Sequence, residues 1–306
     1  MIARHYSSLA EVAPASPLVL SIGIFDGLHL GHLRILETLA AEAQKQQALS
    51  AIWTFSSLPP KAERRRLQHP ALRDLRLAQF GLQELHSVGF TPEVASLSAA
   101  TFLEAVLIER LNVRGIVLGE GARLGRDRET SAEDFLELAR QRGLSVTLVP
   151  HLDSGGERVS SSRIKRLVEN NELSEAATLL GRPYTLGGVV RRDQGRGREL
   201  GFPTANIGLA ALIHPPTGIY SAKVFLSPVF SPASLPAVVY LGTRPTLLPG
   251  AIEVVLEVHI PNWSGELVGK LIEVQPLRFL RPQRRFQSTE ELQTQIARDI
   301  AAALQG

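Results

Sequence analysis

Residues 18–32 read LVLSIGIFDGLHLGH, and the architecture of the first half of the chain can be inferred outward from them. Leu18 to Phe25 is an almost continuous apolar run, which is typical of a strand buried on both faces of a parallel sheet. Asp26 and Gly27 predict a turn. From Leu30 to about Gln47 helix-forming residues dominate and apolar residues recur on one side, so a helix is expected directly after the strand.

The alternation of strand and helix continues to about residue 180. Further strands are expected at 48–55, 113–118 and 145–149, and further helices at 73–87, 101–111, 131–142, 160–169 and 172–180. Ser131 followed by Asp134 resembles a capping box in its acidic variant. This pattern predicts a doubly wound, Rossmann-like α/β sheet with right-handed crossovers.

The pattern of residues changes after Gly181. Short β-rich runs separated by Gly and Pro follow, at 185–192, 219–226, 237–241, 252–260 and 267–275. They predict a compact antiparallel β-barrel. Ser288 and Glu291 frame a capping box before a terminal helix. The 306 residues suffice for two cores, so we expect domains at 1–181 and 182–306.

The composition is that of an ordinary globular chain. Hydrophobic residues make up 44% and charged residues 21%, and the net charge is only +3. A strongly basic surface is therefore not expected, and neither is a nucleic-acid partner. The chain contains no Cys, which excludes disulfides and thiolate metal sites. No run of about eighteen apolar residues occurs. We expect a cytoplasmic protein without export or membrane spanning.

Two histidines mark a first candidate site. His29 and His32 are three residues apart at the start of the predicted helix, so both would face one pocket. Helix N-termini attract phosphate, and imidazole N–H groups there could stabilise charge on a nucleotide α-phosphate. A packed histidine beside a solvated one is the plain structural alternative. Metal binding is another, although no nearby carboxylate completes a ligand set.

A glycine-rich stretch marks a second candidate site. Residues 187–207 read GGVVRRDQGRGRELGFPTANI. Closely spaced glycines let backbone amides approach phosphate, and the arginines add charged donors. A rigid Pro-Thr-Ala-Asn turn is expected to follow, and the oxygens of Thr204 and Asn206 suit a hard cation such as Mg²⁺. The sequence is not a Walker A loop, and a solvated hairpin with a basic tip remains the alternative.

A carboxylate interrupts the apolar run Val254 to Ile260. Burying Glu257 there costs free energy unless it has a partner or a catalytic role. Alternatively, Glu257 points outward by strand alternation, with His259 as a mere neighbour on the same face. Near the C-terminus, Arg281, Arg284 and Arg285 predict a solvated face.

The first site resembles a known family. The pattern G-x-F-D-G-x-H-x-G-H is similar to the FMN adenylyltransferase half of bacterial bifunctional riboflavin kinase/FAD synthetases. The resemblance implies that FMN attacks the α-phosphate of ATP and releases pyrophosphate while the two histidines contact the phosphates. VSSSRIK at 159–165 is similar to the family's I-S-S-T-x-I-R, with Ser162 for Thr and Lys165 for Arg. The nucleotide-binding residues implied here are Gly23, Phe25, Asp26, Gly31, Ser160, Ser161, Ser162 and Lys165.

Two motifs of this half depart from the family. Where the family reads V-G-x-N/D-F-x-F-G, residues 118–125 read LGEGARLG, with Gly121 and Ala122 in place of a polar and an aromatic residue. The family's T-F-x-P-H-P becomes TFSSLPP, with Leu58 in the region of its histidine. Losing one such contact typically costs on the order of 10²-fold in rate. A bifunctional enzyme is favoured; the alternatives are riboflavin kinase alone, and a non-catalytic RNA binder using the arginines at 64–66 and 191–198.

The second site resembles riboflavin kinases closely. G-R-x-L-G-F-P-T-A-N-I is similar to their signature, and P-P-T-G-I-Y, G-T-R-P-T and E-V-H follow in the family's order. The resemblance implies that Glu257 takes the proton of the riboflavin 5′-hydroxyl as it attacks the γ-phosphate, with Mg²⁺ near Thr204 and Asn206. The implied phosphate-binding residues are Gly195, Gly197, Gly201 and Pro203.

The resemblance also implies the ligands. They are ATP, Mg²⁺, riboflavin and FMN, with FAD as the final product, and the barrel and terminal helix would sandwich the isoalloxazine ring. Arg278 and Phe286 resemble a family segment before the last helix. The sequence leaves the oligomeric state open.

Overall fold

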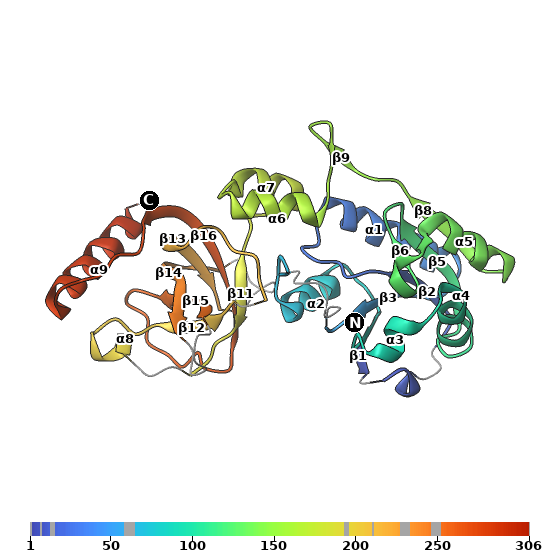
Figure 1. Cartoon of the computed structure of the whole chain (residues 1–306), viewed down its shortest axis with the longest axis horizontal. Coiled ribbons are helices and arrows are strands. Elements are labelled where there is room, and N and C mark those ends of the chain that lie inside the picture. Colours follow the sequence, from blue (N-terminus) through green and yellow to red (C-terminus); the bar gives the residue numbers. More distant parts are fainter. Residues whose placement is uncertain are drawn as a thin grey trace. The chain divides into compact units, whose positions relative to one another are not determined.

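The chain forms two compact units (Figure 1). The computed structural model describes residues 2–6, 8–12, 16–57, 65–192, 196–209, 211–226, 233–245 and 252–305. The first unit consists of Met1–Arg64 and Arg73–Ser160, and the second of Arg65–Leu72 and Ser161–Gly306. Helices α6 (Ser161–Glu169) and α7 (Leu173–Leu180) therefore group with the second unit, although they precede Gly181, where the pattern of residues changes.

A parallel sheet forms the centre of the first unit. Its strand order is β1-β4-β3-β2-β5-β8, and every adjacent pair is parallel. The strands are β1 (Ile2–Tyr6), β2 (Leu18–Ile22), β3 (Leu49–Phe55), β4 (Glu84–Val88), β5 (Val113–Gly119) and β8 (Ser145–Val149). The predicted Rossmann-like sheet is confirmed.

Helices cover both faces of this sheet. Val19 and Ile52 belong to one apolar core with α1 (Leu30–Lys45), whereas Leu20 and Trp53 belong to another with α5 (Ala132–Gln141). Successive strand residues point to opposite faces, so each strand supplies both cores. The shorter elements are α3 (Pro92–Ser96), α4 (Ala99–Thr101), the π-helix at Phe102–Ile108, β6 (Arg123–Leu124), the 3₁₀ turn at Arg126–Arg128, β7 (Thr130–Ser131), β9 (Asp153–Ser154) and β10 (Glu157–Arg158).

The helix predicted at 73–87 is wrong in its second half. Helix α2 (Pro70–Gln79) ends before Gly81, whose φ of +75° a helix cannot accommodate, and β4 follows. The helix predicted at 101–111 is also altered, because the main chain of Glu109 donates to the carbonyl of Glu104 and forms a π-helical turn.

Strand β4 was missed because its polar residues are buried. His86 is fully buried; it accepts a hydrogen bond at Nδ1 from the Tyr6 hydroxyl (3.0 Å) and donates from Nε2 to Glu84 (2.9 Å). Arg4 lies 3.4 Å from the same carboxylate. Burial lowers the pKa of His86, and the Glu84 carboxylate only partly opposes this shift. The chain of hydrogen bonds ties β1 to β4, which the alternation of apolar residues could not indicate.

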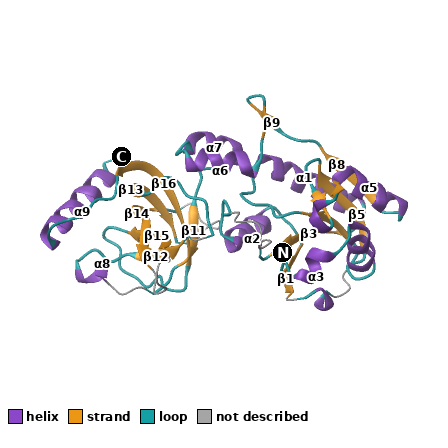
Figure 2. Ribbon diagram, in the orientation of Figure 1, coloured by secondary structure: helices purple, strands orange, loops and turns teal. Residues whose placement is uncertain are grey.

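An antiparallel barrel forms most of the second unit, with α9 (Thr289–Leu304) beside it (Figure 2). The strand order is β11-β16-β13-β14-β15-β12, and the main chain of Arg191 donates to the Asn206 carbonyl (2.8 Å), which bridges the two end strands. The strands are β11 (Leu186–Val189), β12 (Ala205–Gly208), β13 (Gly218–Phe225), β14 (Leu235–Pro245), β15 (Ile252–His259) and β16 (Leu271–Arg281). The predicted barrel is confirmed.

Two details of the barrel differ from the prediction. The last strand begins at Leu271, after a turn at Gly269 (φ +81°), and continues to Arg281, so 267–275 was placed too early. Ala205 and Asn206 are strand residues of β12 and not part of a turn. This places the Asn206 side chain by strand register, opposite residues of β15.

Helix α9 begins at the predicted cap. The main chain of Glu291 donates to Ser288 Oγ (3.2 Å), while the Glu291 carboxylate accepts from the main chain of Gln287 (3.0 Å). The reciprocal bond of the capping box therefore reaches one residue further back than expected. The cap predicted at Ser131 is present too, with the Asp134 main chain donating to Ser131 Oγ (3.1 Å).

Candidate functional site

The turn between β2 and α1 brings the two histidines together. His29 is the N-cap of α1, and its ring stacks on that of His32 with 3.7 Å between centroids. The main chain of His32 donates to His29 Nδ1 (3.3 Å). Because Nδ1 accepts, the proton of the neutral His29 ring lies on Nε2, where it can be donated to an anion. A β-carbon on Gly31 would lie 3.2 Å from this ring, so glycine permits the fold-back.

The same turn has an unusual backbone. Phe25 and Leu28 have φ of 51° and 42°, and Gly27 has 86°. Non-glycine residues in this region carry strain that commonly accompanies functional sites. Phe25 is buried against His32, with 5.2 Å between ring centroids, and Asp26 is buried as well. The turn therefore fixes the histidines at the carboxyl edge of the sheet, where ligands of α/β folds bind.

The other predicted residues of the first site lie in different segments. Ser160 ends the first unit, while Ser161, Ser162 and Lys165 lie on α6 in the second, and their part in nucleotide binding stays a prediction. Gly121 lies in the turn after β5, where the main chain of Ala122 donates to the Gly119 carbonyl (2.9 Å). Leu58 and Arg64 lie outside the described residues.

In the second unit, strand register sets Glu257 between two polar residues. Glu257 pairs with Asn206 of β12 on one side and with Tyr240 of β14 on the other. Directly opposed residues of antiparallel strands share a face. Their chain neighbours Leu256 and Leu241 are almost fully buried, so the polar row of Asn206, Glu257 and Tyr240 faces outward from the barrel.

Arg244 holds the Glu257 carboxylate. Its Nε lies 2.8 Å and its Nη2 2.6 Å from Glu257 Oε1. Glu257 thus points outward from the barrel, as strand alternation predicts, but its side chain is only 18% exposed and is paired with Arg244. Charge-assisted hydrogen bonds of this kind fix the position of the carboxylate. The sequence indicated Arg244 only as part of a motif, without this role.

The predicted cation ligands are Asn206, which belongs to this polar row, and Thr204, two residues before it. Asn206 Nδ2 is 3.5 Å from Thr204 Oγ1, and Asn206 Oδ1 is buried with no hydrogen-bond partner among the residues the structure describes. A buried carbonyl oxygen without a donor is costly, and a hard cation would satisfy it. No cluster of three His, Cys, Asp or Glu suited to a metal occurs within the described ranges. The two oxygens therefore fit a cation that also binds ligand phosphates.

The glycine-rich segment packs on Thr204. Residues Arg196–Glu199 form the short helix α8, and the main chain of Phe202 donates to the Gly197 carbonyl (2.7 Å). A β-carbon on Gly197 would lie 3.0 Å from Thr204 Oγ1, so glycine allows the close approach. Gly201 has a φ of +85°, which makes the turn into Pro203. Gly195 lies outside the described residues.

His259 supports this turn. Its Nδ1 lies 2.9 Å from the Pro203 carbonyl, and its ring meets that of Phe202 edge-on with 5.7 Å between centroids. The ring nitrogen must donate in this contact, because a carbonyl only accepts. His259 therefore positions Pro203, a role that the sequence did not predict.

Tyr240 is a further residue that the sequence analysis missed. Its ring lies over Gly242, where a β-carbon would be 2.6 Å from Cε2. Burial raises the pKa of the Tyr240 hydroxyl, and the Glu257 carboxylate raises it further. Period-two alternation places Tyr240 and Gly242 on one face of β14, but only the register with β15 shows that Glu257 lies on this face.

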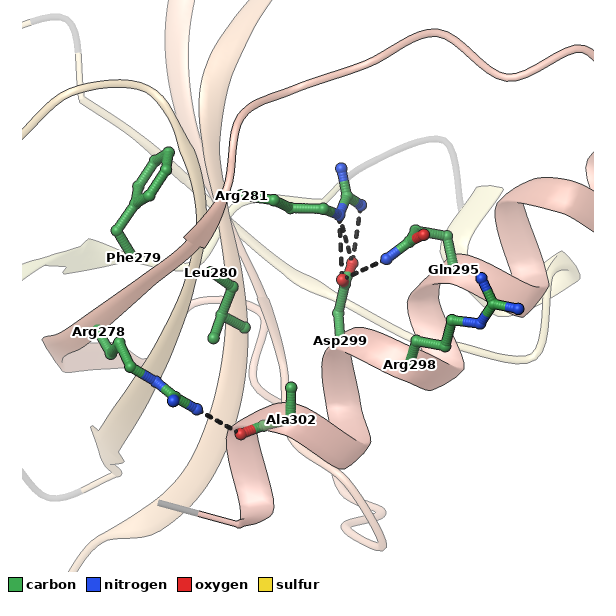
Figure 3. Close-up of a pocket in the computed structure, with 8 residues that line it drawn as sticks. All are labelled: Arg278, Phe279, Leu280, Arg281, Gln295, Arg298, Asp299 and Ala302. Atoms are coloured by element: carbon green, nitrogen blue, oxygen red, sulfur yellow. Dashed lines mark hydrogen bonds and ion pairs between the residues drawn. The ribbon is translucent and has the colours of Figure 1, made fainter.

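A pocket of ≈ 350 Å³ lies between β16 and α9 (Figure 3). Arg281 Nε lies 3.0 and 3.1 Å from the two oxygens of the buried Asp299, and Arg278 donates to the Ala302 carbonyl (2.8 Å). Arg281 is thus paired, and its expected place on a solvated face is wrong. Arg281 and Arg284 lie over the Phe286 ring at 5.7 and 4.7 Å. The lining residues are Arg278, Phe279, Leu280, Arg281, Gln295, Arg298, Asp299 and Ala302.

This pocket is separate from the polar row. Arg281 pairs with Ile219, Ile219 with Tyr240, and Tyr240 with Glu257 across successive strands. Three strand spacings amount to roughly 14 Å. Because α9 packs along β13, β14 and β16, its ion pair with Arg281 fixes the helix on the barrel face that also carries Glu257.

Together, these features are those expected of an enzyme with a candidate site in each of its two units. One unit has paired imidazoles at a helix N-terminus, and the other has a carboxylate held by an arginine near the oxygens of Thr204 and Asn206.

Comparison with known proteins identifies the family. The riboflavin kinase family matches residues 180–305, and the FAD synthetase family matches residues 12–163. The bifunctional riboflavin kinase/FMN adenylyltransferase of Escherichia coli K12 is 33% identical over 95% of this chain and 93% of its own. That of Bacillus subtilis is 31% identical over 94% and 91%. The chain belongs to this family of bifunctional enzymes, with a domain that makes FMN from riboflavin and one that makes FAD from FMN.

A solved structure agrees over the full length. A crystal structure of a Streptococcus pneumoniae protein, named a macrolide-efflux protein, has a TM-score of 0.77, 27% identity and 99% coverage of both chains. Among the described residues of the present chain, no helix is long and apolar enough to cross a membrane. The relatives give no support to the RNA-binding alternative. Two of its arginines are in ion pairs, Arg65 with Glu169 and Arg191 with Glu253.

Proposed function

We propose that the polar row of the barrel is the riboflavin kinase site, with Glu257 as its general base. The supporting observation is that the strand register sets Glu257 opposite Asn206 while Arg244 holds one carboxylate oxygen. A carboxylate accepts a proton from a hydroxyl only as that hydroxyl becomes acidic during attack. Glu257 therefore orients the 5′-hydroxyl of riboflavin and takes its proton as the bond to the γ-phosphate forms.

Thr204 and Asn206 would hold Mg²⁺ in this site. The buried Asn206 Oδ1 and the nearby Thr204 hydroxyl supply the hard oxygen ligands that this ion prefers. When bound, Mg²⁺ neutralises charge on the phosphate oxygens during transfer. Gly197 and Gly201 bring main-chain amides close to the phosphates, with Gly195 and Pro203 as the further expected contacts.

Helix α9 supplies one wall for the flavin ring. Leu292, Ile296 and Ile300 line its inner side and are only half-buried, so apolar surface remains for a planar ring between helix and barrel. Gln293 Nε2 donates to the Leu200 carbonyl (3.2 Å) and ties α9 to the segment after α8. Helix α9, which would contact the flavin ring, is thereby connected to the segment that would contact the phosphates.

The paired histidines would serve the adenylyltransferase reaction. His29 Nε2 donates to the phosphates of ATP, as its hydrogen-bonded Nδ1 requires, and His32 lies beside it. The FMN phosphate attacks the α-phosphate, its bond to the β-phosphate breaks, and pyrophosphate leaves. No covalent enzyme intermediate is needed, so these residues stabilise developing charge. Gly23, Phe25, Asp26 and Gly31 shape the turn that positions them.

The deciding assay incubates the full chain with riboflavin, ATP and Mg²⁺ and separates the flavins by chromatography. Glu257→Gln should abolish FMN formation from riboflavin while FAD formation from added FMN persists. Glu253→Gln, on the same strand, is the matched control and should remain active in both reactions. Kinase turnover unchanged in the Glu257 variant would remove that residue from the mechanism.

The reciprocal experiment tests the first unit. His29→Ala combined with His32→Ala should eliminate FAD formation and spare FMN formation, because the kinase residues lie in the other unit. FAD output that survives the double change would show that the site is misplaced. We also propose 1–181 and 182–306 as the functional domains and the cytoplasm as the location, with small molecules as the partners.

A further inference from the structure

Arg73 of α2 is a buried arginine that donates a hydrogen bond to the turn carrying the two histidines. Its side chain is only 2% exposed. Nη1 donates to the Ile24 carbonyl (3.1 Å) and to Thr54 Oγ1 (3.0 Å), while Nε donates to Asp74 (2.8 Å). Burying a guanidinium is costly unless it is paired and hydrogen-bonded, and these contacts meet that condition. All four residues belong to the first unit.

The Ile24 carbonyl controls the strained part of this turn. A peptide bond is planar, so the carbonyl of Ile24 and the N–H of Phe25 rotate together. Turning that plane over would take the φ of Phe25 from 51° to the negative range that residues with a β-carbon prefer. The hydrogen bond from Arg73 therefore opposes the relaxation of Phe25.

Strand β3 holds the same turn at the preceding residue. The main chain of Gly23 donates to the Trp53 carbonyl (3.0 Å), one residue before Thr54. Thr54 is fully buried and accepts the second hydrogen bond of Arg73. Gly23 and Ile24 are thus held by two different elements. A movement of the turn must break the bond to β3 or the bond to α2.

Phe25 connects this constraint to the histidines. Its ring lies against His32, with 5.2 Å between the centroids, and a β-carbon on Gly23 would lie 3.1 Å from its Cε2 atom. The Phe25 ring is therefore packed between the start of the turn and His32. His32 in turn stacks on His29, with 3.7 Å between the ring centroids. Relaxation of Phe25 would remove this support from the histidine pair.

We propose that Arg73 is a positioning residue for adenylylation, which keeps the β2–α1 turn in the conformation that places His29 and His32 on the phosphates of ATP. This rests on the proposed function of the first unit. Strained main-chain conformations persist only where surrounding contacts impose them, and Arg73 supplies such a contact. Arg73 acts without touching the substrate, because it raises the fraction of molecules whose turn is ready to bind.

The test is steady-state kinetics of FAD formation by the full chain, with ATP and FMN varied separately. Arg73→Met keeps an unbranched apolar side chain and removes every donor. The KM for ATP should rise about 10-fold or more, the loss expected for a hydrogen bond from a charged group, because fewer molecules have the competent turn. Saturating ATP should restore most of kcat, since ATP selects that turn. Riboflavin phosphorylation by the same sample should be unchanged and reports intact protein.

Two further variants test the same contact more gently. Thr54→Val keeps the branched shape of the side chain and removes the acceptor that orients Nη1, so the KM for ATP should rise by a smaller factor. Arg73→Lys keeps a charged donor without the fixed fork of the guanidinium and should recover part of the loss. Adding Thr54→Val to Arg73→Met should change the KM little further, because both changes remove one interaction.

Arg110→Ala is the matched control. Arg110 also donates to main-chain carbonyls of the first unit, those of Leu9 (3.1 Å) and Ala10 (3.4 Å), which lie outside the histidine turn. An arginine with a purely structural role changes the amount of folded enzyme. Its loss can lower kcat but leaves the KM for ATP unchanged, and this is the largest effect expected of Arg110→Ala.

The outcomes separate this proposal from the one on which it rests. If the KM for ATP is unchanged in both Arg73→Met and Thr54→Val while the double histidine variant stops FAD formation, the role of Arg73 is overturned and the histidine site stands. A fall in kcat alone also overturns it, because less folded enzyme explains that result. If the double histidine variant still forms FAD, the proposed site of the first unit is overturned as well.

Discussion

Removing the Asp299 carboxylate should detach α9 from the barrel. Asp299 receives Arg281 Nη2 at 2.7 Å, Arg281 Nε on both oxygens and Gln295 Nε2 at 2.8 Å. The Asp299 side chain is 7% exposed and that of Arg281 17%. Breaking a buried pair costs ~3–5 kcal/mol; because Arg281 keeps some contact with water, we take about 3 kcal/mol for Asp299→Ala. That free energy corresponds to roughly 100-fold in the equilibrium between docked and detached helix.

The assay is amide hydrogen exchange of α9 combined with kinase kinetics. Exchange in residues 289–304 should accelerate by up to about 100-fold, since the inner side of this helix is only half-buried and its bonds with Arg278 and Leu200 are single hydrogen bonds. The KM for riboflavin should rise as the ring loses its wall, while FAD formation from FMN stays within about twofold, as expected for a reaction assigned to the other unit.

A second variant controls for the loss of charge. Replacing both members, Arg281→Met with Asp299→Leu, should restore much of the docking, because apolar pairs of similar volume often match a buried ion pair. The reasoning is refuted if Asp299→Ala leaves both the exchange of α9 and the KM for riboflavin unchanged.

Three further predictions concern other parts of the chain. Asn206→Ala should raise the Mg²⁺ concentration needed for half-maximal kinase rate about 10-fold or more, and an unchanged requirement would exclude Asn206 as a ligand. Gly242→Ala should push the Tyr240 ring toward Glu257 and lower kinase kcat/KM about 10-fold, with FAD formation as the internal control. Because the pKa of His86 is lowered in the folded state, the unfolded state binds more protons than the folded state as the pH falls below ~6.5. Stability of the first unit should therefore be full above that pH and fall below it, and His86→Gln should flatten this dependence in denaturant titrations.

The sequence predicted those parts of the fold whose signal is local. The β2–α1 turn and the barrel were accessible because apolar runs, glycines and caps mark them directly. Strand β4 was hidden, because Glu84 and His86 are polar yet buried through partners on β1 that lie about 80 residues away in the chain. No spacing rule detects a hydrogen-bond chain between segments so distant.

In the candidate sites, too, local sequence signals indicated some residues, whereas roles that depend on contacts between distant segments were missed. Glu257 and Asn206 were indicated by residue type and by motif, but their facing positions depend on the register of β12 and β15. Arg244 and Tyr240 were missed because their roles arise only across strands. Arg281 was misjudged because an arginine-rich segment looks solvated until the buried Asp299 of α9 is placed beside it.

The bridge between Arg191 and Asn206, which joins the two end strands of the barrel, also affects the proposed kinase site. Asn206 accepts the main-chain N–H of Arg191 with its carbonyl, while its buried side-chain oxygen is the proposed Mg²⁺ ligand. Arg191 precedes α8 in the chain, so the bond that joins the two end strands of the sheet also sets where the chain departs toward α8. Closing the barrel and placing the proposed cation ligand therefore depend on the same residue, and a barrel left open at this position would lose both.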